Sequence, residues 1–291
     1  MANEAGIVSP AYTILRCKRP HSSLFYDAYF HTDEFINHNL SKSVEGIRDG
    51  RQISYEAFKW LGIPYCEPTE QEKISALFAV LNERIAKQRD LVEALKKYKR
   101  GVTEAVFSRN LSFSFNGVSY PQWKSKSIGE ICKIQTGKSN TQDETAQGSY
   151  PFYVRSPIIR KSNRYLFDCE AVLTVGDGVG TGKVFHYVTG KFDLHQRVYA
   201  MTDFKDVTGK YFYYYFSHFF YDRVMRMTAK TSVDSVRYEM IDKMTILIPC
   251  RKEQQQIVNF FDCIEGKIMK EEKTLSLLEQ LRSGCLQQLF I

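Results

Sequence analysis

The sequence lacks the segments that would place it in or across a membrane. No apolar run approaches the ~20 residues that a membrane-spanning helix needs. Residues 1–12 have neither the basic nor the apolar region of a signal peptide. We therefore expect a protein of the cytoplasm with no membrane partner.

Cysteine and histidine are present without the spacings that bind metal. The seven cysteines include no Cys-x-x-Cys pair, and the six histidines include no His-x-x-x-His pair. A disulfide framework or a zinc ribbon would need an ordered set of such pairs. We therefore expect free thiols, most of them buried, and no metal site.

Motifs of enzymes that act on nucleic acids are also missing. None of the eight prolines are adjacent, so the Asn/Asp-Pro-Pro-aromatic tetrapeptide of adenine methyltransferases is absent, and no Pro-Asp dipeptide begins a nuclease motif. Residues 175–183 (VGDGVGTGK) imitate the spacing of a phosphate- or adenosyl-binding loop. The residues that follow alternate like a strand, which favours a glycine-rich hairpin. A methyltransferase that uses this tract remains a third hypothesis, and we predict no catalytic residue and no cofactor.

What the chain does have is positive charge, aromatic residues and an internal repeat. The formal net charge is +7 and the aromatic content is 14%. This balance is compatible with a polyanionic partner but does not establish one. A strand-rich core would explain the aromatic residues equally well.

The repeat is the strongest signal. When Ile53 is aligned with Val236, residues 53–107 match residues 236–290 without a gap. Tyr55-Glu56 then meets Tyr238-Glu239, and Glu70-Gln71 meets Glu253-Gln254. Such a gapless series predicts two copies of one structural unit, related by an approximate two-fold axis.

Each copy predicts a short extended segment (61–65 and 244–248), a turn with proline, and a long helix of about 30 residues, ~45 Å long at 1.5 Å per residue. Apolar residues recur in steps of three and four, the seam of a coiled coil. Gly101 and Gly284 mark the expected ends. The residues that we expect to pair the helices are Ile74, Phe78, Leu81, Ile85, Val92 and Leu95 in the first copy and Ile257, Phe261, Ile264, Ile268, Leu275 and Leu278 in the second.

Polar residues interrupt this seam at matching places. Gln88 matches Glu271, and Lys99 matches Arg282. Matched polar interruptions predict that the two helices pair in a fixed register. The alternative is two ordinary amphipathic helices in the core of a bundle.

Between the two helices the hydrophobic pattern changes to that of short strands. Strands are expected within 128–138, 150–160, 164–176, 182–193 and 196–204, followed by a helix over 211–229. The first 50 residues resemble only the end of this domain. The fold class that we predict is α+β, with a mixed α/β domain and two long helices that pair as an antiparallel coiled coil.

A surface that could read DNA is predicted in the central domain. Arg, Lys, Asn and Gln are the side chains whose geometry suits base edges and phosphates, and a solvated basic rim is the alternative. The candidates near turns are Lys138, Asn140, Arg155, Arg160, Lys161, Asn163, Arg164, Lys183, Gln196, Arg197 and Lys230.

These motifs together resemble the specificity subunits of type I restriction–modification systems. The duplicated Tyr-Glu, the Ile-Pro turn (Ile63-Pro64 and Ile248-Pro249) and Glu-Gln-x-x-Ile are similar to the conserved regions of that family. Trp123, Ile128-Gly129-Glu130-Ile131 and Thr136-Gly137-Lys138 resemble the opening of a target recognition domain. Thr231-Ser232-Val233 and Ser43-Val44 resemble its end, and Ser232 joins the DNA-binding candidates.

The resemblance implies a subunit that reads DNA and is not itself an enzyme. Each target recognition domain would read half of a bipartite site in double-stranded DNA, and the paired helices would set the gap and dock methyltransferase subunits. A restriction or motor subunit would be an indirect partner, as a further member of the same complex. The implied domains are 1–53 (end of a first target recognition domain), 54–110 (first conserved region), 111–235 (complete second target recognition domain) and 236–291 (second conserved region).

The chain departs from the family in two respects. The front part of the first recognition domain is missing, and so is the usual double proline before Glu-Gln. A second specificity polypeptide or self-association would then complete the site, and the product of a truncated or silent cassette is an alternative. A coiled-coil adaptor that binds only protein is a further hypothesis, although it leaves the inserted domain unexplained.

Overall fold

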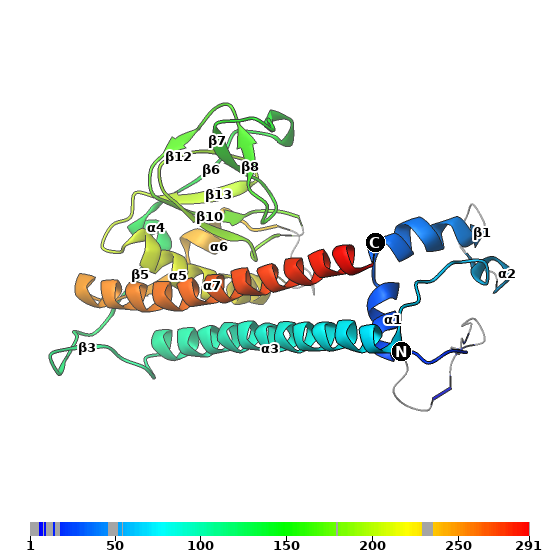
Figure 1. Cartoon of the computed structure of the whole chain (residues 1–291). Coiled ribbons are helices and arrows are strands. Elements are labelled where there is room, and N and C mark those ends of the chain that lie inside the picture. Colours follow the sequence, from blue (N-terminus) through cyan, green and yellow to red (C-terminus); the bar gives the residue numbers. More distant parts are fainter. Residues whose placement is uncertain are drawn as a thin grey trace. The chain divides into compact units, whose positions relative to one another are not determined.

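The computed structural model describes residues 6–7, 9, 14, 18–45, 52–53, 55–178, 180–228 and 235–290. Contacts divide the chain into two compact units, unit 1 (Met1–Lys96 and Gly266–Ile291) and unit 2 (Lys97–Glu265). The two longest helices, α3 (Pro68–Phe107) and α7 (Arg251–Leu289), each contribute a segment to both units (Figure 1). Among the residues described, no helix combines the length and apolar character that crossing a membrane requires.

Unit 1 is helical and is built around an aromatic cluster. The ring centroid of Phe290, at the end of α7, lies 5.1 Å from that of Phe25 and 5.7 Å from that of Tyr29. Phe78 and Leu81 of α3 also belong to this buried cluster. The remaining elements are α1 (Ser23–Phe30), the π-helical η1 (Glu34–Asn39), the 3-10 turn η2 (Leu40–Ser43), the antiparallel pair β1 (Val44–Glu45) and β2 (Gln52–Ile53), and α2 (Tyr55–Phe58).

Unit 2 contains two four-stranded sheets. The first is antiparallel, with the order β11 (Phe185–Val188), β10 (Ala171–Val175), β13 (Val198–Thr202) and β6 (Lys133–Thr136). The second has the order β8 (Arg160–Ser162), β7 (Tyr150–Tyr153), β12 (Lys191–Leu194) and β9 (Phe167–Asp168), and β7 and β12 are parallel. Every residue of β10 is buried. α5 (Gly209–Met227) packs against β10 and β11, and Ala171, Leu173 and Val175 share a buried cluster with Phe192 and Leu194 of the second sheet.

Short elements join these sheets to the long helices. β5 (Lys124–Ser127) pairs with β14 (Thr245–Ile248), and β3 (Ser114–Phe115) pairs with β4 (Val118–Ser119). The others are α4 (Ile128–Ile131), η3 (Thr141–Asp143) and α6 (Tyr238–Asp242). The predicted fold class, α+β with a long helix pair, is confirmed.

The glycine-rich tract is a hairpin, as its alternation predicted. β10 ends at Val175 and pairs antiparallel with β11, which begins at Phe185. Gly178 and Gly182 turn the chain with positive φ angles of 83° and 65°, a conformation that costs glycine little. No helix begins in the described part of this tract, so the nucleotide-loop geometry is not formed there.

Two local predictions need refinement. The strand expected within 128–138 is β6, and Ile128–Ile131 before it is a helical turn, because Ser127 and Glu130 form a capping box around its first residues. Of the two segments predicted to be extended, 244–248 contains β14, which pairs with β5, whereas 61–65 belongs to no helix or strand.

The long helices continue past the glycines that were expected to end them. Gly101 lies inside α3 and Gly284 lies inside α7, and the helices have 40 and 39 residues. A glycine inside a helix costs about 1 kcal/mol. Buried residues beyond it, Phe107 in α3 and Leu286 in α7, offset that cost by packing.

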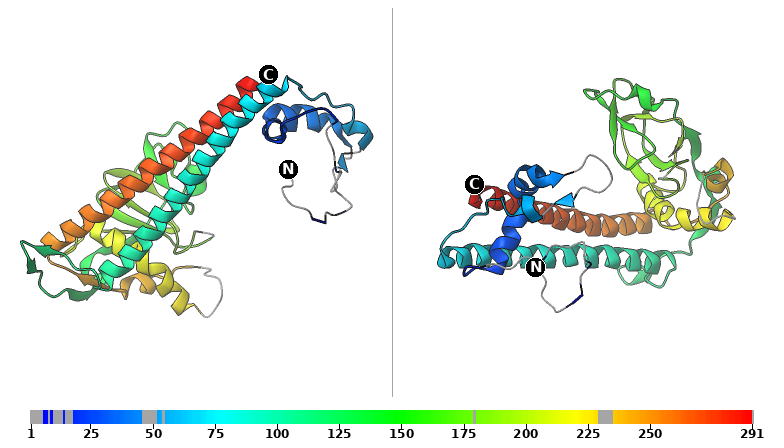
Figure 2. Two further views of the ribbon diagram at one scale, coloured as in Figure 1. Left: turned by 60° about the horizontal axis from the view of Figure 1, so that its bottom comes forward. Right: turned by 90° about the vertical axis from the view of Figure 1, so that its right-hand side faces the viewer.

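Within each unit, α3 and α7 run antiparallel (Figure 2). In unit 1, the contacts run in opposite directions along the two helices. Asn82 contacts Arg282, and further along α3, Gln88 contacts Glu271, which lies earlier in α7. The predicted pairing residues Phe78, Leu81, Ile85, Val92, Ile257, Phe261, Ile264 and Ile268 are buried, and Ile74, Leu95, Leu275 and Leu278 are half-buried. Their role in pairing remains a proposal.

A buried glutamine anchors the start of each long helix. Gln254 is fully buried, its Oε1 accepts a hydrogen bond from Thr208 N (2.8 Å), and its Nε2 donates to Asp206 O and Pro249 O (both 2.9 Å). Gln71 of α3 is equally buried, and its side-chain amide also bonds the backbone through both its oxygen and its nitrogen. Its Oε1 accepts from Ser22 N (2.9 Å), and its Nε2 donates to Cys66 O (2.8 Å).

The repeat therefore extends to individual hydrogen bonds. Thr208 precedes α5, and Ser22 precedes α1, so each glutamine joins the start of a long helix to the start of a shorter one. A tyrosine in the first turns of each shorter helix makes a further matched hydrogen bond. The hydroxyl of Tyr211 in α5 donates to Leu247 O, before α7, and the hydroxyl of Tyr26 in α1 donates to Pro64 O, before α3. We call each buried glutamine with its backbone partners a glutamine clamp.

Substitution of Gln254 tests the clamp. Gln254→Ala leaves three backbone groups without their partner, one of them buried and two partly buried, so we expect the free energy of unfolding to fall by about 2–3 kcal/mol. The matched control is Gln255→Ala, since Gln255 is exposed and bonds only Asn259 of its own helix, and it should change stability by less than ~0.5 kcal/mol. Urea unfolding followed by circular dichroism measures both, and equal effects would contradict the clamp.

Candidate nucleic-acid interface

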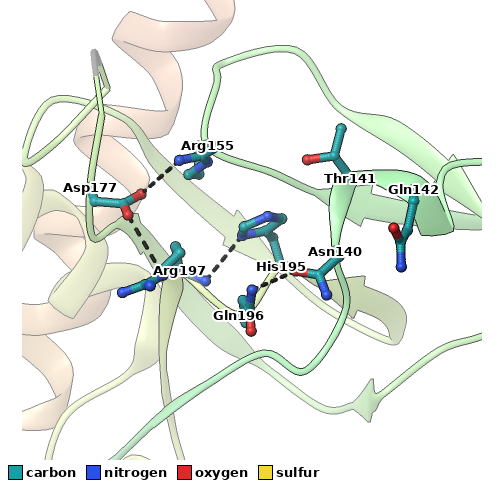
Figure 3. Close-up of a pocket in the computed structure, with 8 residues that line it drawn as sticks. All are labelled: Asn140, Thr141, Gln142, Arg155, Asp177, His195, Gln196 and Arg197. Carbon is teal, nitrogen blue, oxygen red and sulfur yellow. Dashed lines mark hydrogen bonds and ion pairs between the residues drawn. The ribbon is translucent and has the colours of Figure 1, made fainter.

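Several predicted DNA-binding residues lie around one open cavity of unit 2 (Figure 3). The cavity has a volume of about 420 Å³. Its walls come from the loop after β6, the ends of β7 and β10, and the turn before β13. The lining residues are Asn140, Thr141, Gln142, Arg155, Asp177, His195, Gln196 and Arg197.

Two arginines share one carboxylate on one side of this cavity. Arg155 Nη1 donates to Asp177 Oδ1 at 3.4 Å, and Arg197 Nε lies 3.7 Å from Asp177 Oδ2. Because the carboxylate balances only one guanidinium, the group keeps a net positive charge. The side chains of Arg155 and Arg197 are 49% and 64% exposed. Their remaining N–H groups can thus meet an anion from solvent.

Two amides lie against each other nearby. Gln196 Nε2 donates to Asn140 Oδ1 at 2.5 Å. The backbone holds the pair in place, because Gln196 N donates to Ser139 O and Asn140 N donates to Asp143 Oδ2. The amide group of Asn140 and the carbonyl of Gln196 remain as a donor and an acceptor. This is the pair of functions that an adenine edge requires.

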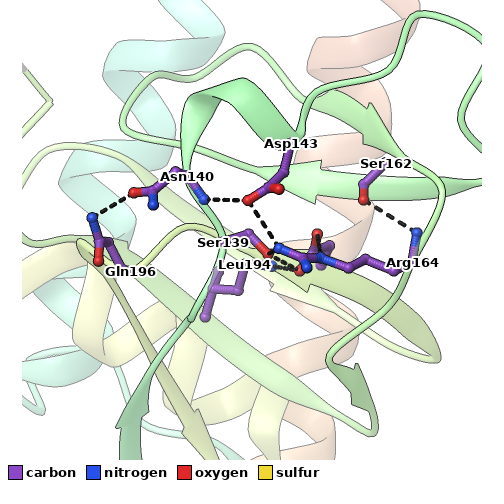
Figure 4. A network of polar contacts seen from close by, with 8 residues as sticks. Ser139, Asn140, Asp143, Ser162, Arg164, Leu194 and Gln196 are labelled. Carbon is purple, nitrogen blue, oxygen red and sulfur yellow. Dashed lines mark hydrogen bonds and ion pairs between the residues drawn. The ribbon is translucent and has the colours of Figure 1, made fainter.

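A network of polar contacts holds the loop that carries Asn140 (Figure 4). Asp193 is fully buried and accepts a hydrogen bond from Ser139 Oγ at 2.7 Å. Arg164 supplies the balancing charge, with Nε 3.6 Å from Asp193 Oδ2. The same guanidinium donates through Nη2 to Ser139 Oγ and contacts Asp143 Oδ2, both at 2.9 Å. Arg164 therefore holds the loop in shape, and its role here is positioning.

His195 at the floor of the cavity is held in its neutral form. Its Nδ1 accepts a hydrogen bond from Arg197 N at 3.0 Å. Burial lowers its pKa, and the positive charges of Arg155 and Arg197 lower it further, whereas Asp177 acts in the opposite direction. A neutral imidazole keeps the cavity from gaining a further positive charge near pH 7.

The other predicted residues lie outside this cavity. Arg160 forms an ion pair with Glu144 at 3.2 Å, and the Lys183 ammonium lies 5.0 Å from the centroid of the Tyr221 ring. Lys138, Lys161 and Asn163 are exposed without lining the cavity. Lys230 and Ser232 fall outside the described residues.

Sequence reasoning missed Asp177 and His195. Asp177 lies in the glycine-rich tract, where the spacing of the glycines suggested only a nucleotide loop or a hairpin. His195 precedes a predicted strand without any metal-ligand spacing. An acidic residue at the tip of a hairpin in a basic domain was the available signal for Asp177. In the described residues no group of three or more His, Cys, Asp or Glu side chains is arranged to hold a metal ion.

Comparison with known proteins identifies a family that this chain resembles. The model of the type I restriction modification DNA specificity domain matches residues 121–280. The specificity subunit of the type I restriction enzyme EcoDI of Escherichia coli is 27% identical over 159 residues, which is 55% of this chain and 34% of that protein. The specificity subunit of MjaIX of Methanocaldococcus jannaschii is 21% identical over 278 residues, which is 85% of this chain and 64% of that protein.

A solved structure shares the fold. The S subunit of a type I restriction-modification system from M. genitalium superposes with a TM-score of 0.66 and 16% identity, over 92% of this chain and 72% of that one. The chain thus spans about a third of the length of the EcoDI subunit and just under two thirds of the length of the MjaIX subunit.

The state of His195 is open to direct measurement. We expect its pKa to lie below the ordinary imidazole value of ~6.5. Since the folded pKa is lowered, the stability contribution of His195 is complete above the unfolded value and is lost as the pH falls below it. NMR titration of the imidazole carbons measures the pKa. Asp177→Asn removes the opposing carboxylate and should lower it further, and titration of His195 at or above ~6.5 would contradict this geometry.

Proposed function

This chain belongs to the family of type I restriction modification DNA specificity domains, and from that premise we propose that it is the sequence-reading subunit of a type I restriction–modification system. It would bind one half of a bipartite site in double-stranded DNA and leave methylation and cleavage to partner subunits. The observation that carries this proposal is the cavity of unit 2, which joins exposed guanidinium groups to a fixed pair of amides.

The two kinds of group suit the two parts of a DNA strand. Arg155 and Arg197 keep donors toward solvent and suit phosphate oxygens, which bind guanidinium groups strongly. Asn140 and Gln196 offer a donor and an acceptor side by side and suit a base edge. Lys138, Arg160, Lys161 and Lys183 would add contacts to the DNA backbone, and Lys230 and Ser232 remain predictions from the sequence.

The long helices would serve the partners. We propose that residues 54–110 and 236–291 are the two conserved regions that dock methyltransferase subunits, that 111–235 is a complete target recognition domain and that 1–53 is the end of another. A restriction or motor subunit would be recruited through the methyltransferase, and a second specificity polypeptide or self-association would supply another half-site. We place this activity in the cytoplasm, where such a complex would meet its DNA.

Removal of the two cavity arginines tests DNA binding. Arg155→Ala/Arg197→Ala should weaken binding to all sequences and lower the log–log salt slope by about 2, since each lost phosphate contact removes about 0.9. Fluorescence anisotropy with a pool of duplexes of random sequence, in the presence of the methyltransferase subunit, measures both quantities. Lys243→Ala is the matched control, because Lys243, which follows α6, is exposed and pairs only locally, with Glu239 of that helix.

The same experiment separates the proposal from a protein-only adaptor. An adaptor would bind the methyltransferase subunit equally with and without the arginines and would retain no sequence from the pool. A specificity subunit would retain a sequence, and the double variant would lose it while still binding the methyltransferase subunit.

Substitution of the amide pair tests base reading. Asn140→Ala should cost about 1–3 kcal/mol on the preferred sequence and relax the choice of base at one position. Selection from the random pool, followed by sequencing, compares the retained motifs. A uniform loss over all sequences would assign Asn140 to the DNA backbone instead.

A further inference from the structure

The contacts between α3 and α7 in unit 1 come in matched sets. Gln88 and Glu271 lie 183 positions apart, occupy the same place in the repeat and meet each other, with 2.7 Å between Gln88 Nε2 and Glu271 Oε2. A residue that meets its own counterpart lies on the approximate two-fold axis of the pair. Every other contact between the helices should therefore occur twice.

Two ion pairs confirm this expectation. Arg89 Nη2 lies 2.9 Å from Glu279 Oε1, and Lys96 Nζ lies 3.0 Å from Glu272 Oε1. In the repeat, Glu272 takes the place of Arg89, and Glu279 takes the place of Lys96. The two ion pairs are thus the same contact on either side of the axis. In both of them α3 supplies the positive charge and α7 the negative charge.

The apolar seam distinguishes little between the two helices. Ile74 and Ile257, Phe78 and Phe261, Ile85 and Ile268, and Leu95 and Leu278 are identical pairs in the repeat. The other two pairs, Leu81 with Ile264 and Val92 with Leu275, replace one aliphatic side chain by another. A second α3 would therefore offer α3 an apolar face similar to that of α7, and the polar positions carry most of the difference between the helices.

Pairing of like helices would bring like charges together at these positions. Two α3 helices in this register would place Arg89 against Lys96 twice. Two α7 helices would place Glu272 against Glu279 twice and Glu271 against itself. Glu265 and Arg282 would form an ion pair between two α7 helices. Asn82 and Lys99 take their places in α3, so two α3 helices would form at most a hydrogen bond there, as Arg282 does with Asn82. Repulsion at such e- and g-like positions sets the choice of partner in coiled coils.

We propose that Arg89, Lys96, Glu272 and Glu279 select the partner of each long helix, so that α3 accepts a helix of the α7 type and rejects a second α3. The favoured occupant of the basic face of α3 is an acidic helix with this repeat. The nearest such helix is the α7 of the same chain, which the covalent connection holds at high local concentration. Two copies of the chain would therefore not join through like helices. This inference does not depend on DNA binding.

Charge reversal in the full chain tests the stability that these charges provide. Arg89→Glu/Lys96→Glu makes both helices acidic at these positions, and Glu272→Lys/Glu279→Arg makes both basic. We expect each double variant to melt about 3–8 °C lower at low salt and the quadruple variant to recover most of that loss. The difference should shrink in high salt, since these side chains are partly exposed and screened.

The matched control also replaces two basic residues of α3 by glutamate, but at positions that form no ion pair with the described residues of α7. These residues are Lys73 and Arg84, and both are exposed. Lys73→Glu/Arg84→Glu should leave the melting temperature within about 2 °C of that of the native chain. A quadruple variant no more stable than the double variants, or a control as unstable as they are, would overturn the proposal.

Mixing the two double variants tests the choice of partner itself. The acidic α3 of one variant complements the basic α7 of the other, and the remaining helices complement each other as well. An affinity tag on the acidic variant should retain the untagged basic variant at least tenfold more than tagged native chain retains untagged native chain. Equal retention would show that the charges stabilise the pair without choosing its partner, and the proposal would fail.

Discussion

The antiparallel pairing of α3 with α7 is the constraint on which both units depend. In each unit the start of one long helix lies against the end of the other. Phe78 packs near Phe290 in unit 1, with ring centroids 6.2 Å apart, and Phe261 packs near Phe107 in unit 2, at 5.8 Å. Neither half of the sequence contains both members of such a pair. The second half therefore completes its core only by using a helix of the first, and the glutamine clamps join each helix start to the domain beside it.

The proposed reading surface of unit 2 is polar and largely self-satisfied before any DNA arrives. Arg155 and Arg197 are held by Asp177, and the loop of Asn140 is held by Arg164 and the buried Asp193. Groups already held in place lose little conformational entropy on binding, which favours affinity. The ion pairs with Asp177 also weaken the attraction of both arginines for a phosphate group. The affinity of such a surface for DNA therefore depends more on a close geometric fit than on net charge, in agreement with a subunit that selects a sequence.

Periodicity and repetition predicted the long helices, most strands, the hairpin at 175–183 and the matched polar seam. These features depend on residues close together in the sequence or on the comparison of two copies. Gly101 and Gly284 misled the prediction, because the packing of distant aromatic residues outweighs the local cost of glycine. The link between Asp177 and Arg155 and the buried position of Asp193 could not be predicted, since both depend on the order of strands in a sheet. The comparison of the copies also left open which residues of α3 meet which of α7.

The register of that meeting is the most direct test. Gln88→Cys/Glu271→Cys places two thiols at the point where the matched residues meet. On mild oxidation, the pairing predicts a disulfide within one chain, found by mass spectrometry as a linked pair of peptides from a protein that stays monomeric in mass. Gln88→Cys/Lys267→Cys, about one helical turn away, should give little of that product. If no link formed between positions 88 and 271, or if the only link joined position 88 of one chain to position 88 of another, the pairing would be contradicted.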